Sequence, residues 1–503
     1  MRPSLRLALA VFSGIVMAKA VTNVPALAPF CLTPLLLAMW APDGDRPLRA
    51  SRVVGLGFVA SLTFGVHAWG IQQYGWPIYG ASAMYLAATG ALFAGLSLPF
   101  LRARSRWVRA GGVTAAWVLA EFTRTLGAYS YPVLLGPCLA DYPVLAQLGA
   151  VGGPWTLEAL VALSAVLCAD AIETIWLRKH PWLPPIPSHR PLIALLILAN
   201  VVVLGGAARL ISAPDLTAPP APGERTITVT IAQGGVPTWL YRRADVLLRL
   251  HEVVRHNYLS LVDEALRGHP DWIVLPESAF GKPISNGTRG LSEVQGLADR
   301  NLGGATLLLG TIHRLEELDP AFPLANLENA VVAVSSGPDG MGQTGRVTKR
   351  RLVPIAEARF KPAASWKPLT TAQGVAGAQV CFESMYPDVS RELAHGGAEA
   401  LVVVLNDAGL RWSPNPSVHA RLGVLRAIET GLPLVHSGQA GVTFMTDAYG
   451  RKTRELGLFE RGLLTARIRP GRVPTLYAAV GDWSVMAFAG LWLVCVLARR
   501  RAT

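Results

Sequence analysis

The sequence predicts a protein of two parts, a membrane α-helical domain and a layered α/β domain. Of its 503 residues, 51% are hydrophobic and only 16% are charged, which is too apolar for one ordinary soluble domain. Long apolar stretches fill the first part of the chain, whereas short β-rich and helical patterns alternate from Arg225 onward. We therefore expect a membrane domain at 1–212, a linker at 213–224, a second domain at 225–475, and a last helix with its tail at 476–503.

Seven apolar segments precede the linker and an eighth lies near the C-terminus, so we expect about eight transmembrane helices. The segments are Leu5–Val21, Val24–Trp40, Val53–Trp69, Ile78–Leu101, Gly111–Thr125, Thr156–Leu177, Pro191–Ile211 and Val485–Ala498. The fifth is the weakest, because Glu121 and Arg124 interrupt it. Unpaired charges are costly at membrane depth, so these two residues are expected either to pair on one helix face or to lie at the outer interface.

The positive charge of the chain indicates membrane topology. The net charge is +13, and its basic residues gather in alternate loops between apolar segments rather than along one face. The clusters are Arg46, Arg49 and Arg52; Arg102, Arg104, Arg106 and Arg109; Arg178, Lys179 and Arg190; and Arg499, Arg500 and Arg501. By the positive-inside rule these loops are cytoplasmic, so the second domain is expected outside. We expect no nucleic-acid partner.

The second domain is expected to alternate strands with helices. The expected strands are Thr226–Ala232, Asp271–Leu275, Ala305–Gly310, Ala330–Ser335, Val375–Cys381, Ala400–Leu405, Leu434–Ser437, Val442–Thr446 and Leu463–Ile468. The expected helices are Ala244–Leu266, Gly290–Asn301, Asp388–His395 and Val418–Thr430. A P-loop, a dinucleotide-binding glycine motif and a His/Cys cluster with metal spacing are missing from the sequence, so neither a cofactor nor a metal is expected.

Cys381 is the candidate nucleophile. The other four cysteines lie in apolar segments, whereas Cys381 ends an apolar run in the polar part of the chain. Such a cysteine is either a small buried hydrophobe or a reactive thiol. A thiol with a pKa of about 8.5 is mostly protonated at neutral pH, so a nucleophilic cysteine needs a nearby base or a positive field.

Two other expected strand ends carry groups of the required kind. Glu277 follows Asp271–Leu275, and a glutamate can serve as the base. Lys349 stands close upstream of Glu357, and a lysine can stabilise the anion that forms when a carbonyl is attacked. Taken singly, a glutamate or lysine at a strand end is more often solvated or ion-paired than catalytic.

These residues together form a recognisable pattern. Glu277 in Leu-Pro-Glu-Ser, Lys349 before Leu-Val-Pro, and Cys381 in Val-Cys-Phe-Glu resemble the Glu-Lys-Cys triad of the nitrilase superfamily, whose fold is an α-β-β-α sandwich. Joined to the membrane segments, the chain resembles the bacterial apolipoprotein N-acyltransferases. The likeness includes Trp117–Arg124, Tyr131-Pro132, Gln147–Gly153, Gln233–Pro237, Lys349–Glu357, Asn406–Ala408, Arg426–Glu429 and Thr475–Trp483.

The resemblance implies a two-stage acyl transfer at a bacterial cytoplasmic (inner) membrane. Cys381 would take the acyl chain of a phospholipid as a thioester, and the α-amine of a diacylglyceryl lipoprotein would then accept it. Glu277 would be the general base and Lys349 the oxyanion stabiliser. Supporting residues would be Glu357 and Glu383, and substrate contacts would come from Trp239, Trp412 and Asn406. The protein would be multi-pass, with its catalytic domain on the periplasmic side.

The chain departs from the family pattern around the triad. Ala356 stands where the family usually has Gly, Phe382 where it often has Tyr, and Gly409-Leu-Arg411 where it has Trp-Phe-Gly. A different amine acceptor is therefore one alternative. A membrane-tethered amidase or nitrilase, which passes the acyl group to water, is a second, and a catalytically silent scaffold a third. The loops Phe280–Ser292 and Gly409–Ser417, rich in Gly, Pro, Ser and Asn, are expected to be mobile lids.

Overall fold

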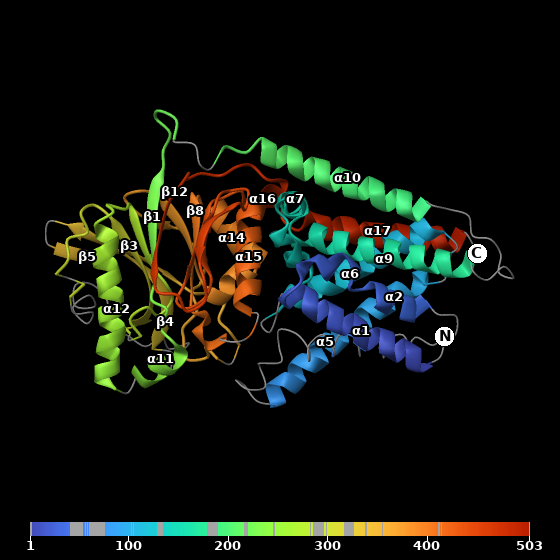
Figure 1. Cartoon of the computed structure of the whole chain (residues 1–503), viewed down its shortest axis with the longest axis horizontal. Coiled ribbons are helices and arrows are strands. Elements are labelled where there is room, and N and C mark those ends of the chain that lie inside the picture. The colour runs from blue at the N-terminus through green and yellow to red at the C-terminus, as the bar shows by residue number, and fades with distance from the viewer. Residues whose placement is uncertain are drawn as a thin grey trace. The chain divides into compact units, whose positions relative to one another are not determined.

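The computed structural model forms two compact units. It describes residues 3–40, 76–101, 105–127, 134–178, 190–215, 220–244, 247–281, 299–315, 326–337, 340–354, 356–410 and 415–501, with residues 54, 55, 57, 59, 103, 283, 284, 296, 297 and 413. Unit 1 comprises Met1–Ser212, Ser413–Arg421 and Val480–Thr503, and unit 2 comprises Ala213–Trp412 and Leu422–Ala479 (Figure 1).

Unit 1 is helical throughout the part that the structure describes. Its longer helices are α1 (Pro3–Thr22), α2 (Thr33–Trp40), α5 (Trp76–Ser97), α6 (Arg106–Phe122), α9 (Pro154–Arg178), α10 (Arg190–Ile211) and α17 (Trp483–Arg501). Shorter ones are η1 (Pro25–Phe30), η2 (Leu98–Phe100), η3 (Thr123–Thr125), η4 (Gly136–Asp141), α7 (Pro143–Ala146) and α8 (Gly149–Gly152). Three described stretches are long and apolar enough to cross a membrane: Ser4–Thr22, Tyr79–Phe100 and Pro154–Thr174.

The predicted membrane segments are therefore seen only in part. Six of the eight coincide with helices of similar bounds. Val24–Trp40 is not one continuous helix, because Pro25 and Pro29 lie in the 3₁₀ helix η1 and α2 starts only at Thr33. Most of Val53–Trp69 lies outside the described residues.

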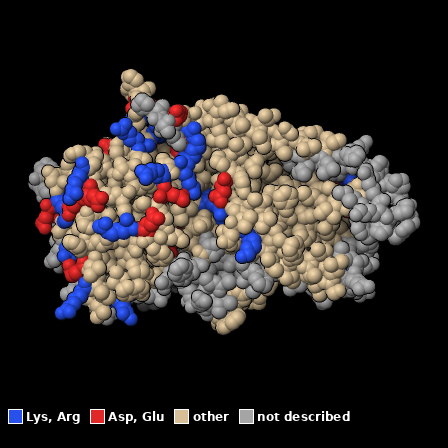
Figure 2. All heavy atoms as spheres, viewed as in Figure 1, with Lys and Arg blue, Asp and Glu red and all other residues tan. Residues whose placement is uncertain are grey.

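The outer surface of unit 1 is apolar. On α10, Leu196, Val201 and Leu204 are 63%, 64% and 66% exposed, and on α17 Met486 is 74% exposed. The face of unit 1 shown in Figure 2 carries few charged side chains, whereas Lys, Arg, Asp and Glu are spread across unit 2. Exposed apolar side chains of this kind suit contact with lipid rather than water.

Two buried carboxylates in the described part of unit 1 have polar partners. Arg124 Nη1 donates to Glu121 Oε2 at 2.7 Å, as the sequence predicts for a pair on one helix face. The carboxylate of Glu158 accepts from Trp117 Nε1 at 2.7 Å and from the Gly136 N–H. These contacts offset the cost of removing the charges from water.

Unit 2 contains two six-stranded sheets in the part that is described. The first has the order β12 (Gly462–Ile468), β1 (Ile227–Gln233), β2 (Trp272–Leu275), β3 (Thr306–Arg314), β4 (Leu327–Gly337) and β5 (Gly340–Thr348). The second has the order β11 (Lys452–Leu456), β10 (Thr443–Thr446), β9 (Leu434–Gly438), β8 (Ala400–Leu405), β7 (Val375–Val380) and β6 (Leu369–Thr370). Strands β1, β2 and β3 run parallel, as do β7, β8 and β9.

The sheets pack face to face through alternate residues. Val229 and Val274 of the first sheet share a buried core with Ala378 and Val402 of the second. The intervening residues, such as Ile273, pack on the other side of the first sheet. Apolar residues on both faces explain why the central strands read as continuous hydrophobic runs in the sequence.

Helices cover the outer faces, giving four layers. Helices α11 (Thr238–Ala244) and α12 (Leu248–Leu266) lie against the first sheet, where Tyr258 and Val262 are buried. Helices α14 (Pro387–His395) and α15 (Asn415–Thr430) lie on the second sheet (Figure 1). Short helices η5 (Cys381–Met385), η6 (Asp407–Leu410) and α16 (Leu476–Val480) complete the unit. The order of layers is α-β-β-α.

The secondary structure of unit 2 differs from expectation in three ways. The nine expected strands are present, but β5, β6 and β11 were not predicted. The expected helix Ala244–Leu266 begins at Leu248 and is preceded by the separate helix α11. Most of Gly290–Asn301 lies outside the described residues, and of its described positions, 296, 297 and 299 form turns while 300 and 301 are irregular, so none is helical.

The buried pair Glu121–Arg124 makes a stability prediction. Glu121→Ala leaves the Arg124 guanidinium buried without its carboxylate, and we expect the free energy of unfolding to fall by about 3–5 kcal/mol. Denaturant unfolding of the protein in detergent micelles measures it. The double variant Glu121→Leu with Arg124→Leu should recover most of the loss.

Lys452 and Glu455 provide the matched control, because they are also three residues apart in the sequence but lie on the surface. The Lys452 Nζ is 3.6 Å from Glu455 Oε2. Glu455→Ala should cost less than about 1 kcal/mol. Equal losses in Glu121→Ala and Glu455→Ala would contradict a buried, stabilising role for the first pair.

Candidate active site

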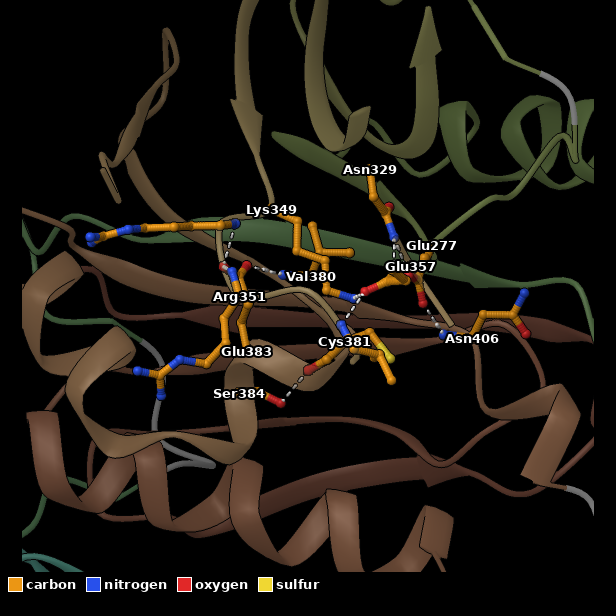
Figure 3. Close-up of polar contacts among 12 residues, drawn as sticks. Glu277, Asn329, Lys349, Arg351, Glu357, Val380, Cys381, Glu383, Ser384 and Asn406 are labelled. Carbon is orange, nitrogen blue, oxygen red and sulfur yellow. Dashed lines mark hydrogen bonds and ion pairs between the residues drawn. The ribbon is translucent and has the colours of Figure 1, made fainter. Parts of the chain in front are cut away.

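The polar residues singled out in the sequence follow strands of both sheets. Glu277 comes two residues after β2, Lys349 directly after β5, Cys381 directly after β7 and Asn406 directly after β8. Ligands of open α/β sheets bind at the carboxyl ends of parallel strands, where side chains from several strands meet. Figure 3 shows these residues gathered into one cluster of polar contacts.

Cys381 lies on a strained turn between β7 and the 3₁₀ helix η5. Its φ is +50°, a value that few residues other than glycine adopt. Glu383 Oε2 accepts the Val380 N–H at 3.0 Å, and Ser384 Oγ donates to the Cys381 carbonyl at 3.0 Å. These two bonds hold the turn, and Cys381 as a whole residue is partly exposed there.

Lys349 is 1% exposed and sits between two carboxylates. Its Nζ donates to Glu357 Oε1 at 2.9 Å and lies 3.9 Å from Glu277 Oε1. Its backbone N–H donates to the Asn329 carbonyl at 2.8 Å, which ties the end of β5 to β4. The ammonium is thereby fixed beside Glu277.

Glu277 receives donors at both oxygens. Asn329 Nδ2 donates to Oε1 at 2.7 Å and the Asn406 N–H donates to Oε2 at 2.9 Å, while the Cys381 thiol also hydrogen-bonds the carboxylate. The turn that carries Glu277 lies directly on Gly310 of β3. A Cβ at that position would stand 2.5 Å from the Pro276 carbonyl oxygen, so a larger residue would displace the turn.

Asn329 is a site residue that the sequence analysis missed. It lies on β4, is 3% exposed, and its Nδ2 donates both to Glu277 and to Glu357 Oε1, the latter at 3.0 Å. Because carboxylates only accept hydrogen bonds, this geometry requires the amide nitrogen to face them. In the sequence, the signal that could have identified Asn329 was a single amide residue near the start of an apolar strand.

Glu383 links the turn of Cys381 to the segment of Lys349. Its Oε1 accepts the backbone N–H groups of Arg350 at 2.9 Å and Arg351 at 3.2 Å, and Trp366 Nε1 at 2.7 Å. The Arg350 guanidinium also stacks over the Trp366 ring, 4.3 Å from its centroid. One buried carboxylate thus positions two of the candidate catalytic residues, and Trp366 was not foreseen from the sequence.

The pKa shifts follow from burial and neighbouring charge. Burial raises the pKa of Glu277, and Lys349 opposes this rise. Burial also raises the pKa of Cys381 well above its usual value, with a further rise from Glu277. Burial acts to lower the pKa of Lys349, but Glu357 and Glu277 outweigh it and raise that pKa. The resting arrangement is a protonated thiol beside a carboxyl base and a fixed cation.

The remaining predicted substrate residues are less informative. Asn406 reaches Glu277 through its backbone, while its side chain accepts the Ala408 N–H at 3.2 Å. Trp239 on α11 is 51% exposed. Trp412 lies outside the described residues, as do most of the expected lid Phe280–Ser292 and part of Gly409–Ser417.

Two family models match the chain, one in each part. A model described as carbon-nitrogen hydrolase matches residues 229–477. A model described as apolipoprotein N-acyltransferase N-terminal domain matches residues 13–167. The nitrilase-type fold expected for the second domain is thereby confirmed.

Relatives match nearly the whole chain. An apolipoprotein N-acyltransferase of Geobacter metallireducens is 28% identical, over 98% of this chain and 95% of its own. One of Rhodopseudomonas palustris is 27% identical, over 95% and 93%. Among solved structures, a carbon-nitrogen hydrolase from Helicobacter pylori has a TM-score of 0.37 at 16% identity, covering 54% of this chain and 94% of its own. A nitrilase superfamily member of Saccharomyces cerevisiae has a TM-score of 0.38 at 19% identity, covering 54% and 97%.

The site makes a prediction about the pH dependence of thiol reactivity. The charge of Glu277 raises the pKa of Cys381, so Glu277→Gln removes that contribution and should lower the pKa. The midpoint of Cys381 alkylation by iodoacetamide should therefore move to lower pH. It should stay above the value of about 8.5 for a free thiol, because burial is the larger cause of the shift.

Peptide mass spectrometry follows the alkylation of Cys381 separately from the other cysteines. Glu392→Gln, which neutralises an exposed acid on α14, is the control and should leave the midpoint where it is. A pH midpoint of alkylation that is unchanged or higher in Glu277→Gln would show that the charge of Glu277 does not raise the pKa of this thiol.

Proposed function

Because the chain belongs to the apolipoprotein N-acyltransferase family, we propose that it transfers an acyl chain from a phospholipid to the N-terminal α-amine of a diacylglyceryl-cysteine, through a thioester on Cys381. The proposal is supported most directly by one observation. Glu277, Lys349 and Cys381 come together at strand ends in a chain that matches both the hydrolase model and the acyltransferase membrane model.

In the first stage Cys381 Sγ attacks the ester carbonyl carbon of the phospholipid. Glu277 takes the thiol proton as the C–S bond forms, and Lys349 stabilises the oxyanion of the tetrahedral intermediate. When the intermediate collapses, the C–O bond to glycerol breaks and the departing oxygen takes the proton from Glu277. A lysophospholipid leaves, and the acyl chain remains as a thioester.

In the second stage the α-amine of the lipoprotein attacks the thioester carbonyl. Glu277 now takes a proton from the amine, and Lys349 again faces the developing oxyanion. Collapse breaks the C–S bond, the sulfur recovers the proton from Glu277, and the amide is released. Glu357 and Glu383 act by position, since the first holds Lys349 and the second holds the turns of both Lys349 and Cys381.

The substrates also support a particular placement in the cell. We propose a multi-pass protein of the bacterial inner membrane with about eight transmembrane helices and with the catalytic domain, 225–475, on the periplasmic side. The apolar exposed faces of α10 and α17 and the alternation of arginine clusters along the sequence support this placement. Lipid substrates could then reach the site without leaving the bilayer.

Intact-mass measurement tests the function directly. The purified protein is incubated with phospholipid in detergent, and a mass increase of one acyl chain that neutral hydroxylamine removes is expected. A diacylglyceryl peptide added afterwards should discharge the adduct and become triacylated. A protein that never carries an adduct but cleaves amides with water would instead be a membrane-tethered hydrolase.

Substitutions at the triad should separate the roles of its members. Cys381→Ser should abolish turnover, because a hydroxyl is a poorer nucleophile with the same base, and no thioester can form on serine. Lys349→Ala should slow turnover on the order of a hundredfold or more through loss of oxyanion stabilisation. Both rates are measured as triacylated peptide formed per minute.

Cys168→Ser is the matched control, since Cys168 is another partly exposed cysteine and is not part of the triad. It should leave turnover unchanged. Triacylated product formed by Cys381→Ser at the wild-type rate would refute the assignment of the nucleophile.

A further inference from the structure

A cavity within unit 2 adjoins the catalytic cluster. Its volume is about 250 Å³, and its wall includes Glu277, Asn329 and Glu357 on the side of the triad. Thr238, Phe360 and Arg359 also line it. A ligand in this cavity would therefore contact both the proposed base and the side chain of Arg359.

Among the described residues that line the cavity, Arg359 carries the positive charge. It is solvent-exposed. Within the described part of the chain its guanidinium has no carboxylate within ion-pair distance, and its recorded contact is with the neighbouring Phe360 ring, 5.1 Å from the centroid. The other arginines near the site differ in this respect. Arg351, for example, pairs with Asp388 at 3.0 Å.

The turn that bears Arg359 is well anchored. The Glu357 N–H donates to the Val353 carbonyl at 3.1 Å, and the Phe360 N–H donates to the Glu357 carbonyl at 2.9 Å. Phe360 is 6% exposed and bridges to Leu327 of β4. The backbone of Arg359 is therefore held next to Glu357, which itself binds Lys349.

The charges around the cavity indicate which kind of ligand group Arg359 would bind. Glu277 and Glu357 bring two carboxylates, and Lys349 supplies one buried ammonium between them. Without Arg359 this wall would present more negative than positive charge, which repels an anion. A glycerophospholipid carries an anionic phosphate joined to its ester groups by only the glycerol carbons, so the donor must bring an anion close to these carboxylates.

We propose that Arg359 binds the phosphate of the acyl donor's head group while the ester carbonyl lies at Cys381. This inference rests on the proposed acyl-transfer function. A guanidinium offers a planar pair of N–H donors that matches two phosphate oxygens, and it stays charged at any physiological pH. The phosphate would leave with the lysophospholipid, so Arg359 serves the donor stage and not the acceptor stage.

The two half-reactions separate this role from a general structural one. Arg359→Ala should slow thioester formation from phosphatidylglycerol by about tenfold to a hundredfold at subsaturating lipid, the usual effect of losing hydrogen bonds to a charged group. Dioleoylglycerol has comparable acyl esters and no phosphate, and its slower reaction should be the same in wild type and Arg359→Ala. Discharge of a preformed thioester by a diacylglyceryl peptide should also be unchanged.

Two further variants sharpen the comparison. Arg359→Lys keeps the charge but loses the paired donors, so it should recover part of the rate with phosphatidylglycerol. Arg454→Ala removes an exposed arginine of β11, which does not line the cavity, and should behave as wild type with both donors.

The outcomes are distinct. Equal slowing with phosphatidylglycerol and dioleoylglycerol, or no slowing with either, would overturn the assignment while leaving the acyl-transfer function intact. Inhibition by inorganic phosphate that is lost in Arg359→Ala, with unchanged rates from phosphatidylglycerol, would indicate a free-phosphate site and also overturn it. A wild-type protein that forms no thioester from either donor would remove the proposed function, and this inference with it.

Discussion

The burial of Lys349 between Glu277 and Glu357 is the constraint on which the catalytic unit depends. Removing a single ion from water costs several kcal/mol even after the protein relaxes, and here Lys349 and Glu277 are buried beside the partly buried Glu357. Asn329 and the Asn406 N–H supply the further donors that the carboxylates require. The partners come from β4, β5 and β8 and from the turn after β2, so the cluster can form only when both sheets have their correct register.

Most of the strands that the sequence revealed lie inside the sheets, and β12 is an edge strand that was also predicted. Strands β2 and β8 have a hydrophobic side chain at every position because both faces are covered, and that pattern is visible without a structure. The missed strands lie at sheet edges. Strand β5 is Gly340–Thr348, rich in glycine and polar residues, and β11 is Lys452–Leu456, in which four of the five residues are polar or charged. Edge strands of this composition have little apolar pattern, and only their pairing with a neighbour defines them.

The same distinction holds for the site. Cys381, Glu277 and Lys349 were predicted because their residue types suit nucleophilic catalysis and their motifs together resemble the nitrilase triad. Cys381 and Glu277 also follow runs that the sequence predicts as strands, whereas the strand before Lys349 was not predicted. Asn329 and Trp366 could not, since an amide in a strand and a tryptophan in a loop are common and neutral. Their importance arises from the carboxylates that they meet in three dimensions, Glu277 and Glu357 for the first and Glu383 for the second.

The burial that makes this cluster costly to fold also suits it to an acyl transfer that must avoid water. Burial raises the pKa of the Cys381 thiol and of the Glu277 carboxyl together, so a proton passed between them is less readily lost to solvent. A thiol of high pKa is a poor leaving group as a bare thiolate, and the second stage of the proposed mechanism therefore requires the proton that Glu277 takes from the attacking amine. Lys349 is held by two carboxylates and stays charged, so it can face an oxyanion in both stages without gaining or losing a proton. The stability of the catalytic unit and the proposed acyl-transfer chemistry thus depend on the same buried charges.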